Sequence, residues 1–375
     1  MSLTITGAQV LGADGFETRD LFIVDGAIAE DPAAGAEVLE GAGLYAAPGI
    51  VDLHGDGFER NFSPRPGVFF DIETALIETD RQLLANGITT GYLALTISWE
   101  PGLRSLENAR RFIDAWTRLR PSFVTDMRIQ LRWETAALDA VEDVEAWLQL
   151  DPAPTLAFND HFSLLLKPTE TLGRDLTKYA ARAGLTAAEY EALTRRTEAR
   201  LDEVPAAIKR LAKAAAAAGV PCFSHDEMTA EARRAHRTLG IAVSEFPMTR
   251  EAAQEAVAGG EATVLGAPNV VRGGSHIGAL DAAPAAREGL CAALASDYYY
   301  PSQMQAAARL LDEGEKGSAD VWSLVSGGPA RAVGFADRGA LATGTRADVV
   351  LFRRSGARAE VVATIAEGRV AFRAM

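Results

Sequence analysis

Alternating apolar and polar residues mark both ends of the chain. Residues 3–11 and 20–30 show this alternation around short turns, and residues 338–352 and 358–372 repeat it near the other end. A period of two residues is typical of strands with one buried face. Because the two termini of a domain commonly lie close together, we expect residues 1–48 and 335–375 to form one composite β-sandwich domain.

Residues 49–334 instead alternate continuous apolar runs with segments of helical periodicity. The apolar runs are Ile50–Leu53, Thr90–Thr96, Ile129–Trp133, Pro154–Phe158, Pro221–Ser224, Ile241–Phe246, Thr263–Leu265 and Ala292–Ser296, and the helical segments include 72–86, 104–119, 187–218 and 303–313. About eight repeats of strand and helix predict an α/β fold, a (β/α)8 TIM barrel. A long helical insertion, 162–200, separates the fourth and fifth runs, and such insertions often cover an active site.

The composition is that of a soluble globular enzyme. A chain of 375 residues with 48% hydrophobic and 23% charged residues fits one large α/β domain with a smaller one attached. The net charge of −14 argues against nucleic acid as a partner, although a local cluster of cations could still bind a small phosphorylated ligand. Two cysteines, no signal peptide and no long apolar window make the cytoplasm the expected location.

Ligand-type residues follow the apolar runs. Three of the five histidines come directly after a run, and carboxylates occupy equivalent places. These six residues are His54, Asp56, Glu134, His161, His225 and Asp297. Each histidine alone is better explained as a core or loop residue, but the carboxyl ends of barrel strands all meet at one mouth. Imidazole and carboxylate together suit Zn²⁺, Mn²⁺ or Fe²⁺, so we expect one or two divalent ions.

Two of these carboxylates are expected to take part in catalysis. His54 and Asp56 lie two residues apart, so in an extended segment they project the same way, toward one ion. Asp297 is expected to hold a metal-activated water and accept its proton. With a single ion bound, Asp297 or Asp56 would only handle protons. A helix N-cap role for Asp297 is disfavoured, because the next helix begins near Ser302.

Substrate contacts are expected from arginines near the mouth. Arg60 and Arg65 lie in a proline-rich loop that begins at His54. They are either solvated loop residues or phosphate ligands, and their position favours phosphate.

A glycine-rich run, 273–275, lies between Arg272 and His276. Its backbone N–H groups could hold an anion beside both side chains, whereas the alternative is a tight turn that needs glycine for a positive φ. We favour substrate contact by Arg272 and His276. His236 lies among arginines in a helical pattern and is expected to be structural or on the surface.

These motifs resemble the amidohydrolase superfamily. Residues 48–56, PGIVDLHGD, are similar to its first-strand signature, in which His-x-His is usual. Asp56 replaces the second histidine, as in the branch of the α-D-ribose 1-methylphosphonate 5-triphosphate diphosphatases, enzymes of the carbon–phosphorus lyase pathway. Segments 63–68, 85–90, 224–226, 245–247, 266–276, 296–299 and 344–350 also resemble that branch.

The resemblance implies a metal-dependent hydrolase of phosphonate degradation. A metal-activated water would attack the α-phosphorus of a 5-triphosphate, releasing pyrophosphate and leaving the 5-phosphate of a small sugar. Glu134 would take the place of the carbamylated lysine that bridges two metals in many relatives. Gly55-Asp56-Gly57 departs from the Thr-Asp-Asn expected there, which leaves the exact substrate open.

Two other functions remain as alternatives. The same activated water could attack a carbonyl carbon, as in a deacetylase or cyclic-amide hydrolase, and a binding protein on a decayed barrel is a third reading. Convergence of Arg60, Arg65 and Arg272 on the metal would favour a polyphosphate, and exposure to solvent would favour an amide. Assembly with further copies of the chain is left open.

Overall fold

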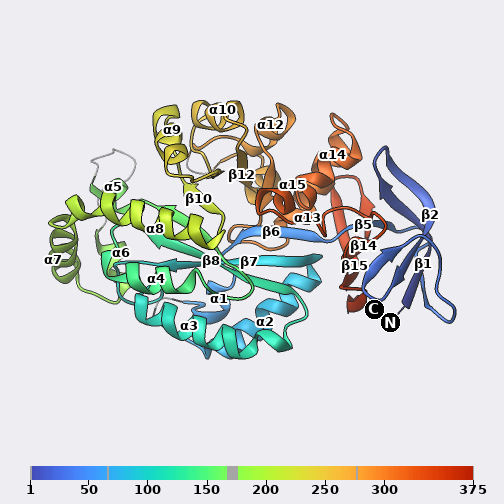
Figure 1. Ribbon diagram of the computed structural model, residues 1–375, viewed down its shortest axis with the longest axis horizontal. Helices are drawn as coiled ribbons and strands as arrows, with labels where there is room; N and C mark the ends of the chain where they lie inside the picture. The colour runs from blue at the N-terminus through green and yellow to red at the C-terminus, as the bar shows by residue number, and fades with distance from the viewer. Residues whose placement is uncertain (1, 66, 167–175, 276–277, 375) are drawn as a thin grey trace.

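A computed structural model describes residues 2–65, 67–166, 176–275 and 278–374. It contains a parallel barrel and, beside it, a mixed sheet made from both ends of the chain (Figure 1). Within these residues, no helix is both long enough and apolar enough to cross a membrane.

The barrel strands follow one another in chain order and pair in parallel. They are β6 (Ile50–Gly55), β7 (Ile88–Ile97), β8 (Asp126–Glu134), β9 (Thr155–Asn159), β10 (Cys222–His225), β11 (Val243–Glu245), β12 (Ala262–Gly266) and β13 (Ala293–Ala295). Each coincides with one of the apolar runs, which confirms the predicted barrel. Strand β6 is buried along its whole length, as expected for a strand covered on both faces.

The seam between the first and last strands is closed at the carboxyl end. Asp297 N–H donates to His54 C=O, and Asp56 N–H donates to Asp297 C=O, both at 2.9 Å. The buried carboxylate of Asp52 accepts hydrogen bonds from the backbone N–H and the hydroxyl of Ser296. Asp52, which the sequence showed only as part of the first-strand signature, therefore joins β6 to β13.

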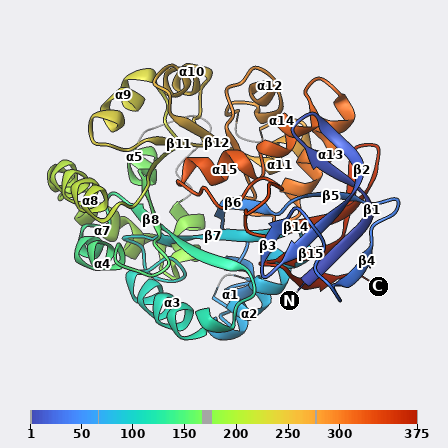
Figure 2. The ribbon, with the colours of Figure 1, turned by 45° about the vertical axis from the view of Figure 1, so that its right-hand side comes forward.

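Helices surround the barrel (Figure 2). They are α1 (Glu59–Phe62), α2 (Ile72–Ala85), α3 (Leu106–Leu119), α4 (Val141–Trp147), α8 (Val204–Ala218), α9 (Ala230–Thr238), α10 (Arg250–Ala258), α11 (Ala267–Arg272), α12 (Ala282–Arg287), α13 (Ser302–Glu313), α14 (Ser318–Ser323) and α15 (Gly327–Ala332). Helix α2 begins after Asp71, whose carboxylate accepts from Thr74 N–H, and α3 begins after Ser105 in the same way. Their apolar faces, including Leu83 and Trp116, pack into the main core.

The predicted insertion lies between β9 and β10. It contains α5 (His161–Leu166), α6 (Leu176–Ala183) and α7 (Ala187–Glu198), at the end of the molecule away from the mixed sheet (Figure 1). Tyr190 of α7 donates a hydrogen bond of 2.5 Å to Glu100, and Phe162 of α5 meets Trp99 with ring centroids 4.9 Å apart. The insertion therefore packs on the loop after β7, at the carboxyl end of the barrel.

The mixed sheet combines strands from both ends of the chain. They are β1 (Ser2–Gly12), β2 (Gly15–Val24), β3 (Ala27–Ala29), β4 (Glu37–Glu40), β5 (Tyr45–Pro48), β14 (Val349–Ser355), β15 (Arg358–Ala366) and β16 (Arg369–Arg373). Antiparallel pairing of β5 with β14 joins the two halves. The strands form one sheet that branches at β1, which pairs with β2, β4 and β5.

Candidate metal centre

Side chains from several strands meet at the carboxyl end of the barrel. His54 lies in β6, Glu134 ends β8, His161 follows β9, His225 ends β10 and Asp297 follows β13. Potential ligand atoms lie within 4.8 Å of one another in three overlapping groups: His54 with His225 and Glu245, His161 with His225 and Asp226, and His54 with Asp56 and Asp297. Five of the six residues expected from the sequence are thus brought together, and Glu134 reaches the cluster through His161.

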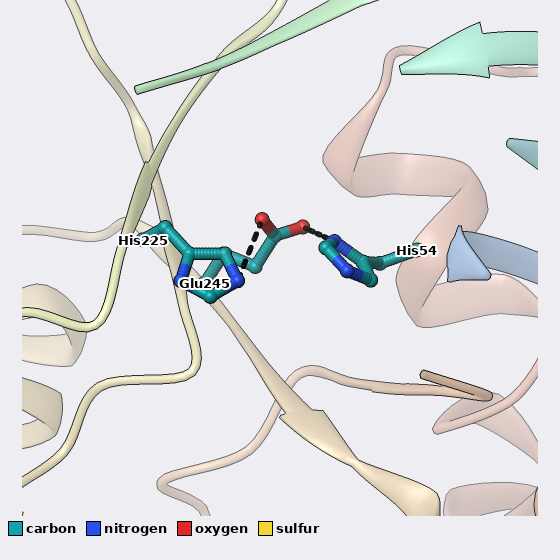
Figure 3. A group of neighbouring side chains, drawn as sticks. All are labelled: His54, His225 and Glu245. Atoms are coloured by element: carbon teal, nitrogen blue, oxygen red, sulfur yellow. Dashed lines mark ion pairs between the residues drawn. The ribbon is translucent and has the colours of Figure 1, made fainter. Parts of the chain in front are cut away.

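Glu245, which the sequence reasoning missed as a ligand, lies between two of the histidines. Its carboxylate oxygens are 3.2 Å from His54 Nδ1 and 4.0 Å from His225 Nε2 (Figure 3). Burial alone would lower the pKa of His54, but Glu245 raises it above its ordinary value. At His225 burial is the larger effect, and its pKa is lowered. His225 therefore favours the neutral imidazole, the form that can bind a metal ion, more strongly than His54 does.

This donor set fits a divalent ion. His54 Nδ1 and Glu245 Oε2 are buried and have no hydrogen bond of acceptable geometry within the described residues. The buried His225 Nδ1 also lacks such a bond, although the Asp226 carboxylate lies 3.0 Å from it. Buried polar atoms in proteins nearly always have partners. Two imidazoles and one carboxylate are a common ligand set for zinc and related ions, so an ion held here would complete the coordination of all three side chains.

His161 is held between two carboxylates. Its Nδ1 lies 2.6 Å from Glu134 Oε1, and its Nε2 lies 3.3 Å from Asp226 Oδ2. Burial opposes protonation, but these carboxylates raise the pKa of His161 to about 9. Burial likewise opposes ionisation of Glu134, yet His161 lowers the pKa of that carboxyl to about 2. Glu134 is the ion-pair partner of His161 here, and its expected bridging of two ions stays a prediction.

Three strand ends turn through residues with positive φ. Asp226 follows β10, Phe246 follows β11 and Asp297 follows β13, with φ of 59°, 51° and 54°. Non-glycine residues rarely adopt this conformation, which costs on the order of 1–3 kcal/mol each and is found mostly at functional sites. Here the sharp turns bring the carboxylates of Asp226 and Asp297 into the ligand groups.

Asp297 lies beside Asp56 at the seam of the barrel. Burial and the negative charge of Asp56 raise the pKa of Asp297 to about 6. Two carboxylates this close repel each other unless a cation or a proton lies between them. The pair can therefore hold a cation, or Asp297 can accept a proton near neutral pH.

Strand β8 places three polar side chains toward the site at alternate positions. Gln130 donates to Glu245 Oε1 at 2.8 Å, Arg132 lies 3.2 Å from His225 Nε2, and Glu134 holds His161. The sequence reasoning identified only Glu134. The signal was present in residues 129–134, IQLRWE, because alternate residues of a strand share a face and a buried polar residue needs a partner.

Two glycines leave room for the ring of Tyr300. A Cβ atom at Gly55 would lie 2.8 Å from Tyr300 Cε1, and one at Gly57 would lie 3.0 Å from Cε2. Real Cβ atoms essentially never approach as closely as at Gly55, and the contact at Gly57 would be tighter than most. This packing explains why glycine flanks Asp56 here, in place of the Thr-Asp-Asn that the family resemblance led us to expect.

The two arginines that follow β6, Arg60 in α1 and Arg65 beyond it, lie at the surface. Arg60 and Arg65 are exposed, and the guanidinium of Arg60 lies 5.8 Å from the ring centre of Tyr298, the residue after Asp297. Arg60 is therefore near the mouth. Substrate contact by either arginine stays a prediction.

The glycine-rich run directly follows helix α11. Arg272 is the last residue of α11 and is exposed, and Gly273 then adopts a φ of 84°. Ser275 N–H donates to the Asp281 carboxylate at 2.9 Å, so this amide already has an anionic partner. Glycine is thus needed for the turn. Substrate binding by Arg272 stays a prediction, and His276 lies outside the described residues.

His236 belongs to a structural network, as expected. Its Nδ1 lies 2.7 Å from Glu227 Oε1, and Glu227 also accepts from Ser244 and pairs with the buried Arg233. The network joins α9 to β11.

A curated relative covers most of the chain. The α-D-ribose 1-methylphosphonate 5-triphosphate diphosphatase of Escherichia coli (strain K12) is 34% identical over 345 residues, which are 88% of this chain and 88% of the relative. The dihydroorotase of Pelotomaculum thermopropionicum is 40% identical over 75 residues, 18% of each chain. No family model matches the chain.

Solved structures share the fold. A D-hydantoinase superposes with a TM-score of 0.60 at 18% identity, covering 100% of this chain and 95% of its own. A triazine hydrolase variant gives a TM-score of 0.65 at 15% identity, with 98% and 94% covered. With the barrel, its ligand cluster and the E. coli relative taken together, the chain belongs to the amidohydrolase superfamily of hydrolases, in the family of the α-D-ribose 1-methylphosphonate 5-triphosphate diphosphatases.

Proposed function

We propose that this hydrolase cleaves the phosphoanhydride bond of α-D-ribose 1-methylphosphonate 5-triphosphate, or of a close analogue, during phosphonate degradation. The products would be the 5-phosphate and pyrophosphate. The main support is the 34% identity that extends over 88% of the chain to the E. coli diphosphatase. A His and carboxylate cluster at the mouth of the barrel supports metal-dependent hydrolysis.

The side chains of the mouth have separate tasks in this proposal. His54, His225 and Glu245 would hold one divalent ion, and Asp56 would share in binding it or a second one. When bound, the ion supplies positive charge that lowers the pKa of a water molecule and neutralises phosphate oxygens. As the water oxygen bonds to the α-phosphorus, the bond to the β-phosphate oxygen breaks and pyrophosphate leaves with its electron pair. Asp297, with its pKa raised to about 6, would take the proton of the water.

A second candidate is the hydrolysis of a cyclic amide. The short match to a dihydroorotase favours it, and so does the exposure of Arg60, Arg65 and Arg272, since fixed cations at the mouth were the expected mark of a polyphosphate site. However, the buried Arg132 supplies a cation inside the cluster, beside Asp56 and His225, which favours negative charge on the group under attack.

One experiment separates the two candidates. The purified protein, supplied with Zn²⁺, Mn²⁺ or Fe²⁺ in turn, is incubated with ribose 5-triphosphate derivatives and with dihydroorotate. Metal-dependent release of pyrophosphate supports the diphosphatase. Ring opening of dihydroorotate without pyrophosphate release would contradict it.

A further inference from the structure

Arg132 is a buried cation that forms no close ion pair with its neighbours in the described residues. The residue is only 6% exposed, in the middle of the inward-facing row of β8. Its Nη1 lies 3.6 Å from Asp56 Oδ2, and its Nη2 lies 3.2 Å from His225 Nε2. Its Nε is buried without a hydrogen-bond partner among the described residues. The guanidinium can therefore accept a further anionic partner.

Arg104 shows how a fully paired guanidinium looks in this chain. Arg104 donates to both oxygens of Glu59 at 2.9 Å. Arg233, whose Nε also lacks a hydrogen bond of acceptable geometry, still lies close to two carboxylates, 3.2 Å from Glu227 and 3.1 Å from Glu261. Arg132 has no comparably close carboxylate in the described part of the chain. Because buried cations are stable only when well paired, its position is better explained by a ligand than by the fold alone.

The surroundings of Arg132 select the kind of ligand. Five carboxylates face the mouth: Asp56, Glu134, Asp226, Glu245 and Asp297. An anionic substrate needs fixed positive charge to enter such a site. A guanidinium presents parallel N–H donors at the spacing of two oxygens of a phosphoryl group, a match that a carbonyl oxygen does not offer.

We propose that Arg132 binds the phosphoryl group under attack, donating from its guanidinium to two non-bridging oxygens. Its contacts with Asp56 and His225 would be exchanged for these oxygens when the substrate binds. This inference rests on the proposed function, and it makes Arg132 the residue that favours a tetrahedral phosphoryl group over a planar carbonyl. It also places the main phosphate contact inside the barrel, on β8, and not at the exposed Arg60, Arg65 and Arg272.

The test measures orthophosphate binding to the metal-supplied full chain by calorimetry, with metal content measured in parallel. Arg132→Met should weaken phosphate binding about 10- to 100-fold, because charge-assisted bidentate contacts are lost. Arg132→Lys keeps the positive charge but loses the two parallel N–H donors of the guanidinium, so it should bind phosphate several-fold more weakly than wild type. Arg118→Met, an exposed arginine on α3 that pairs with Glu73, is the matched control and should bind phosphate like wild type. Metal content should be the same in all four proteins.

The outcomes separate this inference from the proposed function. Weaker phosphate binding in both Arg132 variants supports the anion site, even if the wild-type protein releases no pyrophosphate and the proposed function fails. Pyrophosphate release by the wild type, with unchanged phosphate affinity in Arg132→Met, overturns the role of Arg132 and leaves the function in place. If Arg132→Met does not fold, Arg132→Lys decides: wild-type affinity contradicts the inference, and reduced affinity at normal metal content supports it.

Discussion

The two ends of strand β8 differ in how well their charged side chains are paired. At its start, Asp126 lies 3.0 Å from Arg128 and 2.6 Å from Arg338, and both guanidiniums stack over the ring of Phe335. At its end, Glu134 belongs to a mouth where five carboxylates face Arg132 and three histidines. The amino end is balanced by its own side chains, whereas the carboxyl end is short of positive charge. In a barrel of this kind, side chains at the amino end of the strands serve stability, and those at the carboxyl end serve the binding of ligands.

The largest effect is expected at the mouth. His225→Ala removes a side chain that two of the three ligand groups share, so bound metal should be lost and kcat/KM for the hydrolysed substrate should fall about 10³-fold or more. Metal analysis and steady-state kinetics measure both. His236→Gln, at a histidine outside the mouth, should change neither. Normal metal content and full activity in His225→Ala would remove the metal site as described.

At the amino end the corresponding change should act on stability. Arg338→Met leaves Asp126 with one arginine and removes a cation stacked on Phe335, so the free energy of unfolding should fall by about 3 kcal/mol. Urea unfolding gives this value, and metal content should not change. Loss of metal without loss of stability in Arg338→Met would contradict the division of roles between the two ends of β8.

Added metal should stabilise the chain through the mouth alone. At a free concentration of about 100 times its Kd, an ion that binds only the folded state adds about 2.7 kcal/mol to the free energy of unfolding. The wild type should show a higher melting temperature with metal, and Arg338→Met should gain by a similar amount. His225→Ala should gain little, and an equal gain in that variant would mean that the ion binds elsewhere.

The smallest effect concerns a single carboxylate of the mouth. Burial and Asp56 raise the pKa of Asp297, which means that the folded chain disfavours its charged form. Without metal, Asp297→Asn should therefore raise the free energy of unfolding by about 1 kcal/mol, as often found when a functional residue is replaced by a neutral one. Chelator-treated proteins are compared by urea unfolding. A loss of stability would show that Asp297 is already balanced by its neighbours.

The sequence predicted the barrel because buried parallel strands leave a plain signal. Apolar runs separated by helical segments identified all eight strands, and ligand-type residues just after the runs identified His54, His161 and His225. The same rule missed Glu245, since the run Ile241–Phe246 included it as part of a strand. Asp226 was missed because only the positive φ that follows β10 turns it toward His161.

The loop residues could not be placed in the same way. A strand fixes the direction of every second side chain, so Gln130 and Arg132 could have been found from the register of Glu134. Nothing comparable fixes the direction of Arg60 or Arg65, because it depends on the path of the segment between β6 and α2, which contains only the single-turn helix α1. Which arginine lies deepest in the mouth is therefore a property of the register of β8, and charge counting along the chain does not show it.

The seam at Asp52 and Ser296 has a consequence for the order of assembly. These residues are 244 positions apart, and the hydrogen bonds beside them join His54 and Asp56 to Asp297. Contacts so distant along the chain carry a large loop-closure cost, which falls once the intervening strands have folded. During synthesis the first histidine leaves the ribosome long before Asp297, so the complete ligand cluster exists only after the last barrel strand has docked. Any metal ion that this cluster binds would therefore load onto a nearly finished protein, and a nascent chain would present only part of the candidate site to competing ions.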